Sequence, residues 1–217
     1  MIRFEHVTKS YGRTTILKDL NFTIPDGQFV ILIGPSGCGK TTTMKLINRL
    51  LEPDSGIISI NGQDIRLQDK VELRRHIGYV IQQIGLFPNM TVAQNICVVP
   101  NLLKYSKEAC DKIVHELLEL VNLPYEQYAH KYPSEMSGGQ QQRVLLARAL
   151  CAAQKILLLD EITANMDAET ENMVLYALGN ASNGRTVISI SHRLYKKSEG
   201  QETRQIPIFT NFKKENI

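Results

Sequence analysis

The pattern of hydrophobic positions divides the chain into strand-like stretches near both ends and a helical stretch in the middle. Alternating or continuous apolar runs predict strands over residues 2–7, 16–24, 29–33, 57–60, 63–65, 76–81, 155–159 and 185–190, the last strand of the chain. The runs at 29–33 and 155–159 are continuous, which is typical of strands buried on both faces in a parallel sheet. Asn61-Gly62 is a strong hairpin signal between two of these strands.

Helical spacing dominates from Thr91 to about Leu150. We expect helices over residues 41–50, 106–121, 138–150 and 167–178. The second of these would bury a face made of Ala109, Ile113, Leu117 and Leu120. Strands alternating with helices around a helical insert predict an α/β core with a helical sub-domain.

Composition limits the classes of protein to consider. The chain has 217 residues, 43% hydrophobic and 22% charged, which is ordinary for one globular domain, with or without a sub-domain. The net charge of +3 is too small to indicate a nucleic acid or anionic lipid partner. The start of the chain lacks the apolar core of a signal peptide, and we expect no membrane span. The four cysteines form no C-x-x-C pair, so neither zinc nor a redox motif is indicated.

The clearest chemical motif is the run Gly34-Pro35-Ser36-Gly37-Cys38-Gly39-Lys40-Thr41, which fits G-x-x-x-x-G-K-[ST] and is followed by Thr42. It follows a predicted strand and opens a predicted helix, so its N–H groups can surround phosphate oxygens. Lys40 would reach the phosphates, and the Thr41 hydroxyl would ligate Mg²⁺. Alone, the loop indicates only a P-loop nucleotide binder. Because Cys38 lies near a helix N-terminus and Lys40, we also expect an alkylator-sensitive thiol that ATP protects.

A second motif is the pair Asp160-Glu161 at the end of an apolar strand. Ligands of doubly wound sheets lie at the carboxyl ends of strands. Asp160 is suited to holding Mg²⁺ through water, and Glu161 to activating the attacking water as general base. Taken alone, the two carboxylates could equally belong to a surface turn.

The run Met136-Ser137-Gly138-Gly139-Gln140 precedes a predicted helix and resembles the L-S-G-G-Q signature of ATP-binding-cassette (ABC) ATPases, with Met136 in place of leucine. The resemblance implies that the signature binds the γ-phosphate of an ATP held by a partner subunit. The chain would then work as half of an isologous dimer that encloses two ATP molecules.

Other elements of the ABC family occur in the expected order. Tyr11 resembles the aromatic residue that stacks on adenine, and Gln82 resembles the Q-loop glutamine that ligates Mg²⁺. Asp167 resembles the D-loop aspartate that communicates across the dimer. His192 resembles the switch histidine that contacts the γ-phosphate. These likenesses imply that catalysis involves Glu161, His192, Lys40 and Gln82, and that Mg²⁺ is held by Thr41, Gln82 and Asp160.

The resemblance also implies the architecture. It covers about residues 1–194 and implies a RecA-like P-loop NTPase core, an antiparallel β sub-domain and a helical signature sub-domain inserted at about residues 88–150. Residues 195–217 depart from the family pattern and form an atypical tail. Within the family, Gly34–Arg49, Ile77–Met90 and Tyr132–Arg143 are most similar to the ATPase subunits of glycine betaine/carnitine/choline importers.

The family likeness implies an ATPase that couples hydrolysis to uptake of a quaternary-amine osmolyte. Its cofactors would be ATP and Mg²⁺, and its partners a transmembrane permease, a second ATPase subunit and, indirectly, a solute-binding protein, with no nucleic acid. The place of action would be cytoplasmic, on the inner face of the cell membrane.

Three alternatives stay open. Ile162 stands where importers usually have proline, and residues 185–194 read more like exporter ATPases. A soluble ABC ATPase without a transport role is a second alternative. An inactive cassette that serves as a scaffold is the third, although the intact Lys40, Asp160, Glu161 and His192 argue against it.

Overall fold

The computed structural model of the chain describes residues 1–81, 85–151, 154–162, 168–181, 184–190 and 203–208. Its strands are β1 (Ile2–Tyr11), β2 (Thr14–Ile24), β3 (Phe29–Ile33), β4 (Ser55–Ile60), β5 (Gln63–Asp64), β6 (Ile77–Val80), β7 (Ile156–Asp160), β8 (Thr186–Ile190) and β9 (Thr203–Pro207). Its helices are α1 (Lys40–Ile47), α2 (Lys70–Arg75), α3 (Val92–Ile96), α4 (Val98–Leu102), α5 (Lys107–Leu120), α6 (Tyr125–Tyr128), α7 (Gly138–Leu150) and α8 (Ala168–Ala181), with 3-10 turns η1 (Ile65–Leu67) and η2 (Pro133–Glu135).

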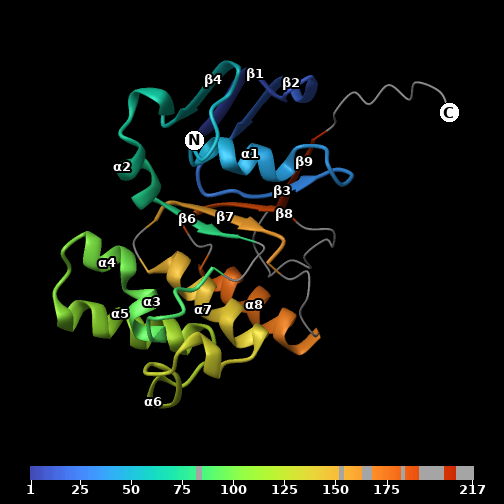
Figure 1. Cartoon of the computed structure of the whole chain (residues 1–217). Coiled ribbons are helices and arrows are strands. Elements are labelled where there is room, and N and C mark those ends of the chain that lie inside the picture. The colour runs from blue at the N-terminus through green and yellow to red at the C-terminus, as the bar shows by residue number, and fades with distance from the viewer. Residues whose placement is uncertain (82–84, 152–153, 163–167, 182–183, 191–202, 209–217) are drawn as a thin grey trace.

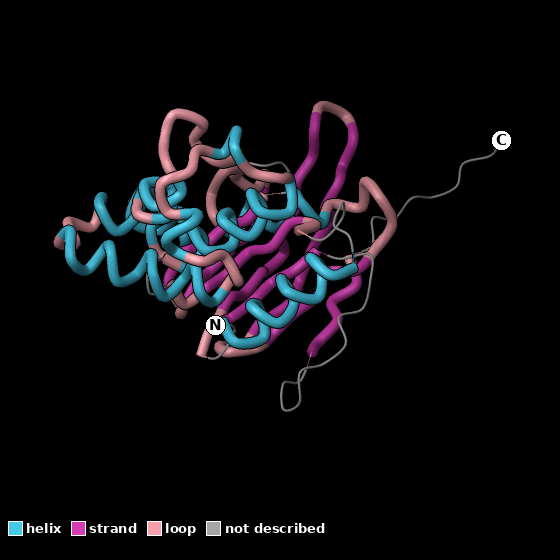
Figure 2. The backbone as a smooth tube through the Cα atoms, turned by 90° about the horizontal axis from the view of Figure 1, so that it is seen from below, coloured by secondary structure: helices cyan, strands magenta, loops and turns pink. Residues whose placement is uncertain are grey.

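The strands form two sheets. A four-stranded antiparallel sheet has the order β2-β1-β4-β5, and a five-stranded parallel sheet has the order β6-β7-β8-β3-β9. Helix α1 lies between the two sheets, and α7 and α8 cover the opposite face of the parallel sheet (Figure 1). Seen from below, helices lie in front of the strands and run in roughly the same direction (Figure 2). The predicted α/β core with an antiparallel β sub-domain and a helical sub-domain is therefore confirmed.

Two hydrophobic cores meet at the parallel sheet, because successive side chains of a strand point to opposite faces. On β7, Ile156 and Leu158 join a core with α1 and the antiparallel sheet. Leu157 and Leu159 join the core beneath α7 and α8. Strand β7 is therefore buried on both faces, as its continuous apolar sequence predicts.

The helical region differs from expectation in one respect. Helices α3 to α6 form a lobe beside α7 (Figure 1). The buried face of α5 is centred on Cys110, Val114 and Leu118, while the predicted face of Ala109, Ile113, Leu117 and Leu120 is only half-buried at its flank. The face is rotated by one position because α3 and α7 approach α5 from that side. No helix in the described ranges combines the length and apolar character of a membrane span.

The end of the chain also differs from expectation. The prediction that residues 185–190 form the last strand is wrong, because β9 follows them and pairs in parallel with β3. Ile206 and Ile208 are buried against the core shared with α1. The amide of Ile208 donates to the carbonyl of Ile33 at 2.8 Å, so β9 ends beside the loop that follows β3.

Candidate functional site

The glycine-rich loop joins β3 to α1 with a backbone that requires glycine. Gly34, Gly37 and Gly39 have φ angles of 154°, 79° and 100°, values that other residues rarely adopt. A Cβ on Gly34 would lie 2.5 Å from the carbonyl oxygen of Ile208. A Cβ on Gly39 would lie 2.5 Å from a methyl group of Leu17. The turn is therefore held tightly between β9 on one side and β2 on the other.

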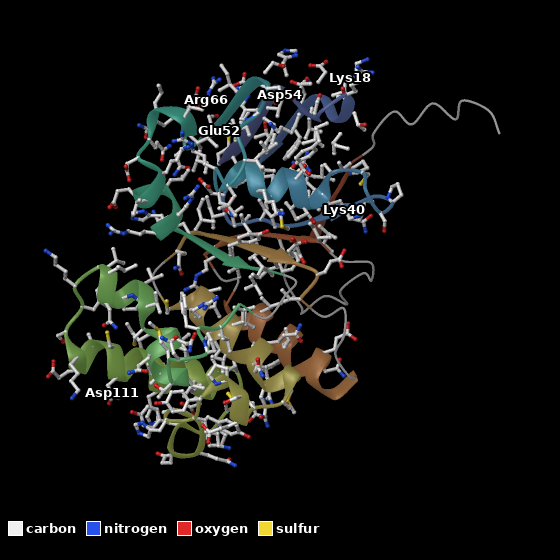
Figure 3. The ribbon with its side chains drawn as sticks, viewed as in Figure 1. Lys18, Lys40, Glu52, Asp54, Arg66 and Asp111 are labelled. Atoms are coloured by element: carbon white, nitrogen blue, oxygen red, sulfur yellow. The ribbon has the colours of Figure 1, made fainter. Side chains whose placement is uncertain are left out.

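Lys40 is the first residue of α1 and is buried, with an exposed fraction of 7%. Its ammonium donates to the carbonyl of Gly34 at 2.8 Å and to that of Pro35 at 3.0 Å. These two bonds hold the charge over the loop that precedes the helix (Figure 3). An ammonium has three donors, so a third hydrogen can reach an anion placed in the loop.

The acidic strand end lies next to this loop. The Thr41 hydroxyl donates to Oδ1 of Asp160 at 3.2 Å, and the Tyr79 hydroxyl donates to Oδ2 at 3.4 Å. Asp160 is 4% exposed. Burial is the main influence and raises the pKa of its carboxyl, as does the nearby charge of Glu161, while the bonds from Thr41 and Tyr79 oppose this rise. Burial, together with the charge of Asp160, raises the pKa of Tyr79.

A carboxylate and a hydroxyl from two distant segments are the hard oxygen ligands that Mg²⁺ prefers. A divalent cation beside Asp160 would also offset the electrostatic cost of burying a carboxylate next to Glu161. Thr41 and Asp160 therefore fit a magnesium ion.

A pocket of about 440 Å³ opens at this place. It is lined by Tyr11, Ile16, Ser36, Gly37, Gly39, Lys40, Thr41, Thr42 and Glu161. Tyr11 is half-exposed among the residues that line this pocket, so a flat ring of a bound molecule could stack on its side chain. Ile16 was not anticipated, because a single aliphatic residue of an outer strand carries no motif.

Glu161 has an unusual backbone. Its φ of 50° lies in the left-handed region, and its amide donates to the carbonyl of Ile190 at 3.2 Å. The left-handed region is uncommon for residues other than glycine, asparagine and aspartate. This conformation turns the chain at the end of β7 and brings Glu161 into the pocket lining.

The signature lies on the helical side. Ser137 caps α7, with its hydroxyl accepting from the amide of Gln140 at 3.3 Å, while the Gln140 carboxamide oxygen accepts from the amide of Ser137 at 3.0 Å. Met136 is buried in the helical core, as expected of an apolar residue at the start of the signature. Ser137 and Gly138 are exposed, and among the described residues the signature takes no part in lining the pocket around Lys40. The N-terminus of α7 is therefore exposed at the surface of the chain.

The family model of the ABC transporter matches residues 17–164 of the sequence. The chain belongs to the ABC transporter family. The carnitine transport ATP-binding protein OpuCA of Listeria monocytogenes is 51% identical over 195 residues, covering 88% of this chain and 49% of that protein. The glycine betaine/carnitine/choline transport ATP-binding protein OpuCA of Bacillus subtilis is 52% identical over 173 residues, covering 79% of this chain and 45% of that protein. The chain thus spans about half the length of the curated relatives it matches.

A solved structure is similar to this chain over most of the length of both. The ATP-binding cassette MJ0796, in a dimeric post-hydrolysis state bound to ADP and Pi, superposes with a TM-score of 0.80. The two chains are 35% identical, and the match covers 89% of this chain and 88% of that one. The P-loop cassette fold implied by the motifs is therefore confirmed.

Three of the residues assigned by resemblance, Gln82, Asp167 and His192, lie outside the described residues. For Cys38 the structure argues against the reactive thiol that the sequence suggested. Cys38 is 1% exposed and packs in the core beneath α1, so it points away from solvent although it belongs to the loop. A reagent would have to open the loop to reach it.

Proposed function

We propose that this chain is the ATP-binding and ATP-hydrolysing subunit of an ABC importer, and that it acts as a dimer on a transmembrane permease. The observation that carries this proposal is the meeting of Thr41 and Asp160 at 3.2 Å beside a pocket lined by the glycine loop and Glu161. The arrangement supplies a phosphate cradle, a site for a cation and a carboxylate in one place.

Each group has a distinct role in the proposed reaction. The loop amides and the N-terminus of α1 bind the phosphates, and Lys40 adds a positive charge. Tyr11 stacks on the adenine ring at the rim of the pocket. Thr41 and Asp160 would hold a magnesium ion, which when bound would neutralise part of the phosphate charge. Glu161 orients the attacking water and accepts its proton.

The remaining roles assigned by resemblance stay part of the proposal. Gln82 would join the cation site, and His192 would contact the γ-phosphate. Asp167 would communicate with the opposite site of the dimer.

The exposed signature supports the dimeric part of the proposal. Ser137 and Gly138 present a helix N-terminus that is separate from the pocket of their own chain. In a two-fold dimer this N-terminus faces the phosphate of the partner's nucleotide. The similarity to a cassette solved as a dimer with ADP and Pi is consistent with this arrangement.

The substrate proposal rests on the relatives. Both OpuCA proteins carry names of carnitine or glycine betaine/carnitine/choline transport and share about half of their residues with this chain over the matched regions. We therefore propose uptake of a quaternary-amine osmolyte, with the chain peripheral to the inner face of the membrane. Co-purification from native membranes in mild detergent tests this. Recovery of an exporter-type membrane protein in place of a permease and its solute-binding protein would contradict it.

The catalytic proposal is tested by Glu161→Gln, which keeps the size of the side chain and removes its basicity. We expect ATP binding to persist while the hydrolysis rate falls by about 10²–10⁴-fold, the usual contribution of a general base. We also expect ATP to trap the variant as a closed dimer, seen by analytical ultracentrifugation. Unchanged hydrolysis, or a variant that stays monomeric with saturating Mg-ATP, would refute the scheme. Glu171→Gln, on α8 outside the pocket lining, is the matched control.

A further inference from the structure

The signature of this chain has a side-chain support that comes from outside the motif. The carboxamide nitrogen of Gln140 donates to the hydroxyl of Tyr128 at 3.1 Å. Tyr128 is the last residue of α6, twelve positions before Gln140. Gln140 thereby bridges two elements, because its carboxamide oxygen accepts from the amide of Ser137 at the start of α7.

The orientation of the carboxamide follows from this pair of bonds. The amide of Ser137 can only donate, so the oxygen of the carboxamide must face it. The nitrogen then faces Tyr128, whose hydroxyl accepts. Removing that hydroxyl would leave the orientation to the Ser137 amide and would take away one of the two bonds that hold the carboxamide in place.

Tyr128 is held firmly enough to act as a support. Tyr128 is 9% exposed within the helical core, and the Lys131 ammonium lies 4.5 Å from its ring centroid. The backbone around it is tied to α3, because Ala93 donates to the carbonyl of Ala129 at 2.9 Å and Val92 donates to that of Lys131 at 2.8 Å. The ring is thus held by packing in the core, and the backbone that carries it is tied to α3.

The cap also leaves the signature serine ready to donate. The Ser137 hydroxyl accepts from the amide of Gln140 at 3.3 Å, which uses a lone pair and leaves its hydrogen available. That hydrogen can be donated to a phosphate oxygen placed at the N-terminus of α7. A rigid cap fixes the hydroxyl position before the phosphate arrives, which lowers the entropy lost on closure.

We propose that Tyr128 is a positioning residue for the signature, acting through Gln140 to preset Ser137 for the nucleotide of the partner subunit. This inference rests on the proposed function, since it needs the ATP dimer. Tyr128 itself touches no substrate. Its loss should affect dimer closure around ATP and leave nucleotide binding to the monomer unchanged.

The test is Tyr128→Phe in the Glu161→Gln background, with ATP-dependent dimerisation followed by ultracentrifugation. The bond is already present in the free chain, so its loss weakens association only through the reordering of the cap that closure then requires. With about fivefold per signature as the upper bound, and two signatures in each dimer, we expect a dimer association constant lower by up to about 25-fold. The ATP affinity of the monomer should not change.

Tyr125→Phe is the matched control. Tyr125 lies on the same short helix, but its hydroxyl donates to Asp111 at 2.6 Å, and Asp111 lies on the helical lobe well away from Lys40 (Figure 3). We expect this control to dimerise like its parent. A second readout is the double variant with Gln140→Ala, in which Tyr128→Phe should add little because the bond is already lost.

The outcomes separate the two proposals. If Glu161→Gln alone fails to dimerise with ATP, the proposed function and this inference both fall. If it dimerises and Tyr128→Phe matches Tyr125→Phe, only the role of Tyr128 is overturned. Additive effects of Tyr128→Phe and Gln140→Ala would likewise show that the two residues act independently.

Discussion

Alanine substitutions at Gly34 and Gly37 distinguish two reasons why the loop needs glycine: its backbone conformation and the close approach of neighbouring atoms. Both residues have positive φ angles, 154° and 79°. A Cβ at Gly37 would meet nothing within 4 Å, whereas a Cβ at Gly34 would lie 2.5 Å from the Ile208 carbonyl oxygen and 2.6 Å from the Cys38 sulfur. Gly37→Ala therefore carries only the backbone cost of its conformation, about 1–2 kcal/mol. Gly34→Ala adds a steric conflict with main chain, which no rotamer change can relieve.

The magnitude at Gly34 follows from what has to move. Carbon and oxygen atoms rarely approach below about 3.2 Å, so β9 or the loop must shift by several tenths of an ångström, and forcing extra atoms into packed structure costs typically 1–3 kcal/mol. Gly34→Ala combines this steric cost with the cost of a φ angle that favours glycine. We therefore expect it to lower the free energy of unfolding by about 2 kcal/mol more than Gly37→Ala does.

Urea unfolding of the two variants and the parent, monitored by circular dichroism, measures this difference. The slope of unfolding free energy against urea should stay the same, so that the midpoints report stability directly. Equal midpoints for Gly34→Ala and Gly37→Ala would refute the reasoning, and would mean that Ile208 does not lie against the loop in solution.

Two further predictions concern charge and thiol chemistry. Lys40→Ala should weaken ATP binding by about 10–100-fold, the value of charge-assisted hydrogen bonds to phosphate, as measured by titration with a fluorescent ATP analogue. The control Lys18→Ala, on the outer strand β2, should bind ATP like the parent. Equal affinities of the Lys40 and Lys18 variants would contradict the role of Lys40. Burial raises the pKa of Cys97 to about 12, so at pH 8 only about one thiol in ten thousand is a thiolate. We expect native Cys97 and buried Cys38 to react with iodoacetamide far more slowly than in the unfolded chain, as followed by mass spectrometry of their peptides. Labelling at the unfolded rate would show that these sites open.

Local patterns were sufficient for many of the elements and for the strand–turn–helix shape of the glycine loop. The helix at Gly138–Leu150 has the predicted bounds because its start is specified by a capping serine and glutamine a few residues apart. The hairpin at Asn61-Gly62 and the buried strand before Asp160 were also predicted, since turn chemistry and apolar runs are read over a few residues. The glycines, Lys40 and Thr41 carry their chemistry in their spacing, because one strand, one turn and one helix build the whole loop.

Patterns within the chain did not determine which distant segments meet, and only the family resemblance implied that Thr41 and Asp160 share a cation. The bond between Thr41 and Asp160 joins residues 119 positions apart, across a sheet in which β8 separates β3 from β7. The placement of β9 beside β3, and of Ile208 against Gly34, depends on the pairing of strands far apart in the chain. The buried face of α5 was misread by one position because a helix with apolar residues on adjacent rows can turn either row inward, and its neighbours decide which. Short-range patterns specify residues and their chemistry, whereas strand order and packing, which are cooperative over the whole domain, decide which of those residues form a site.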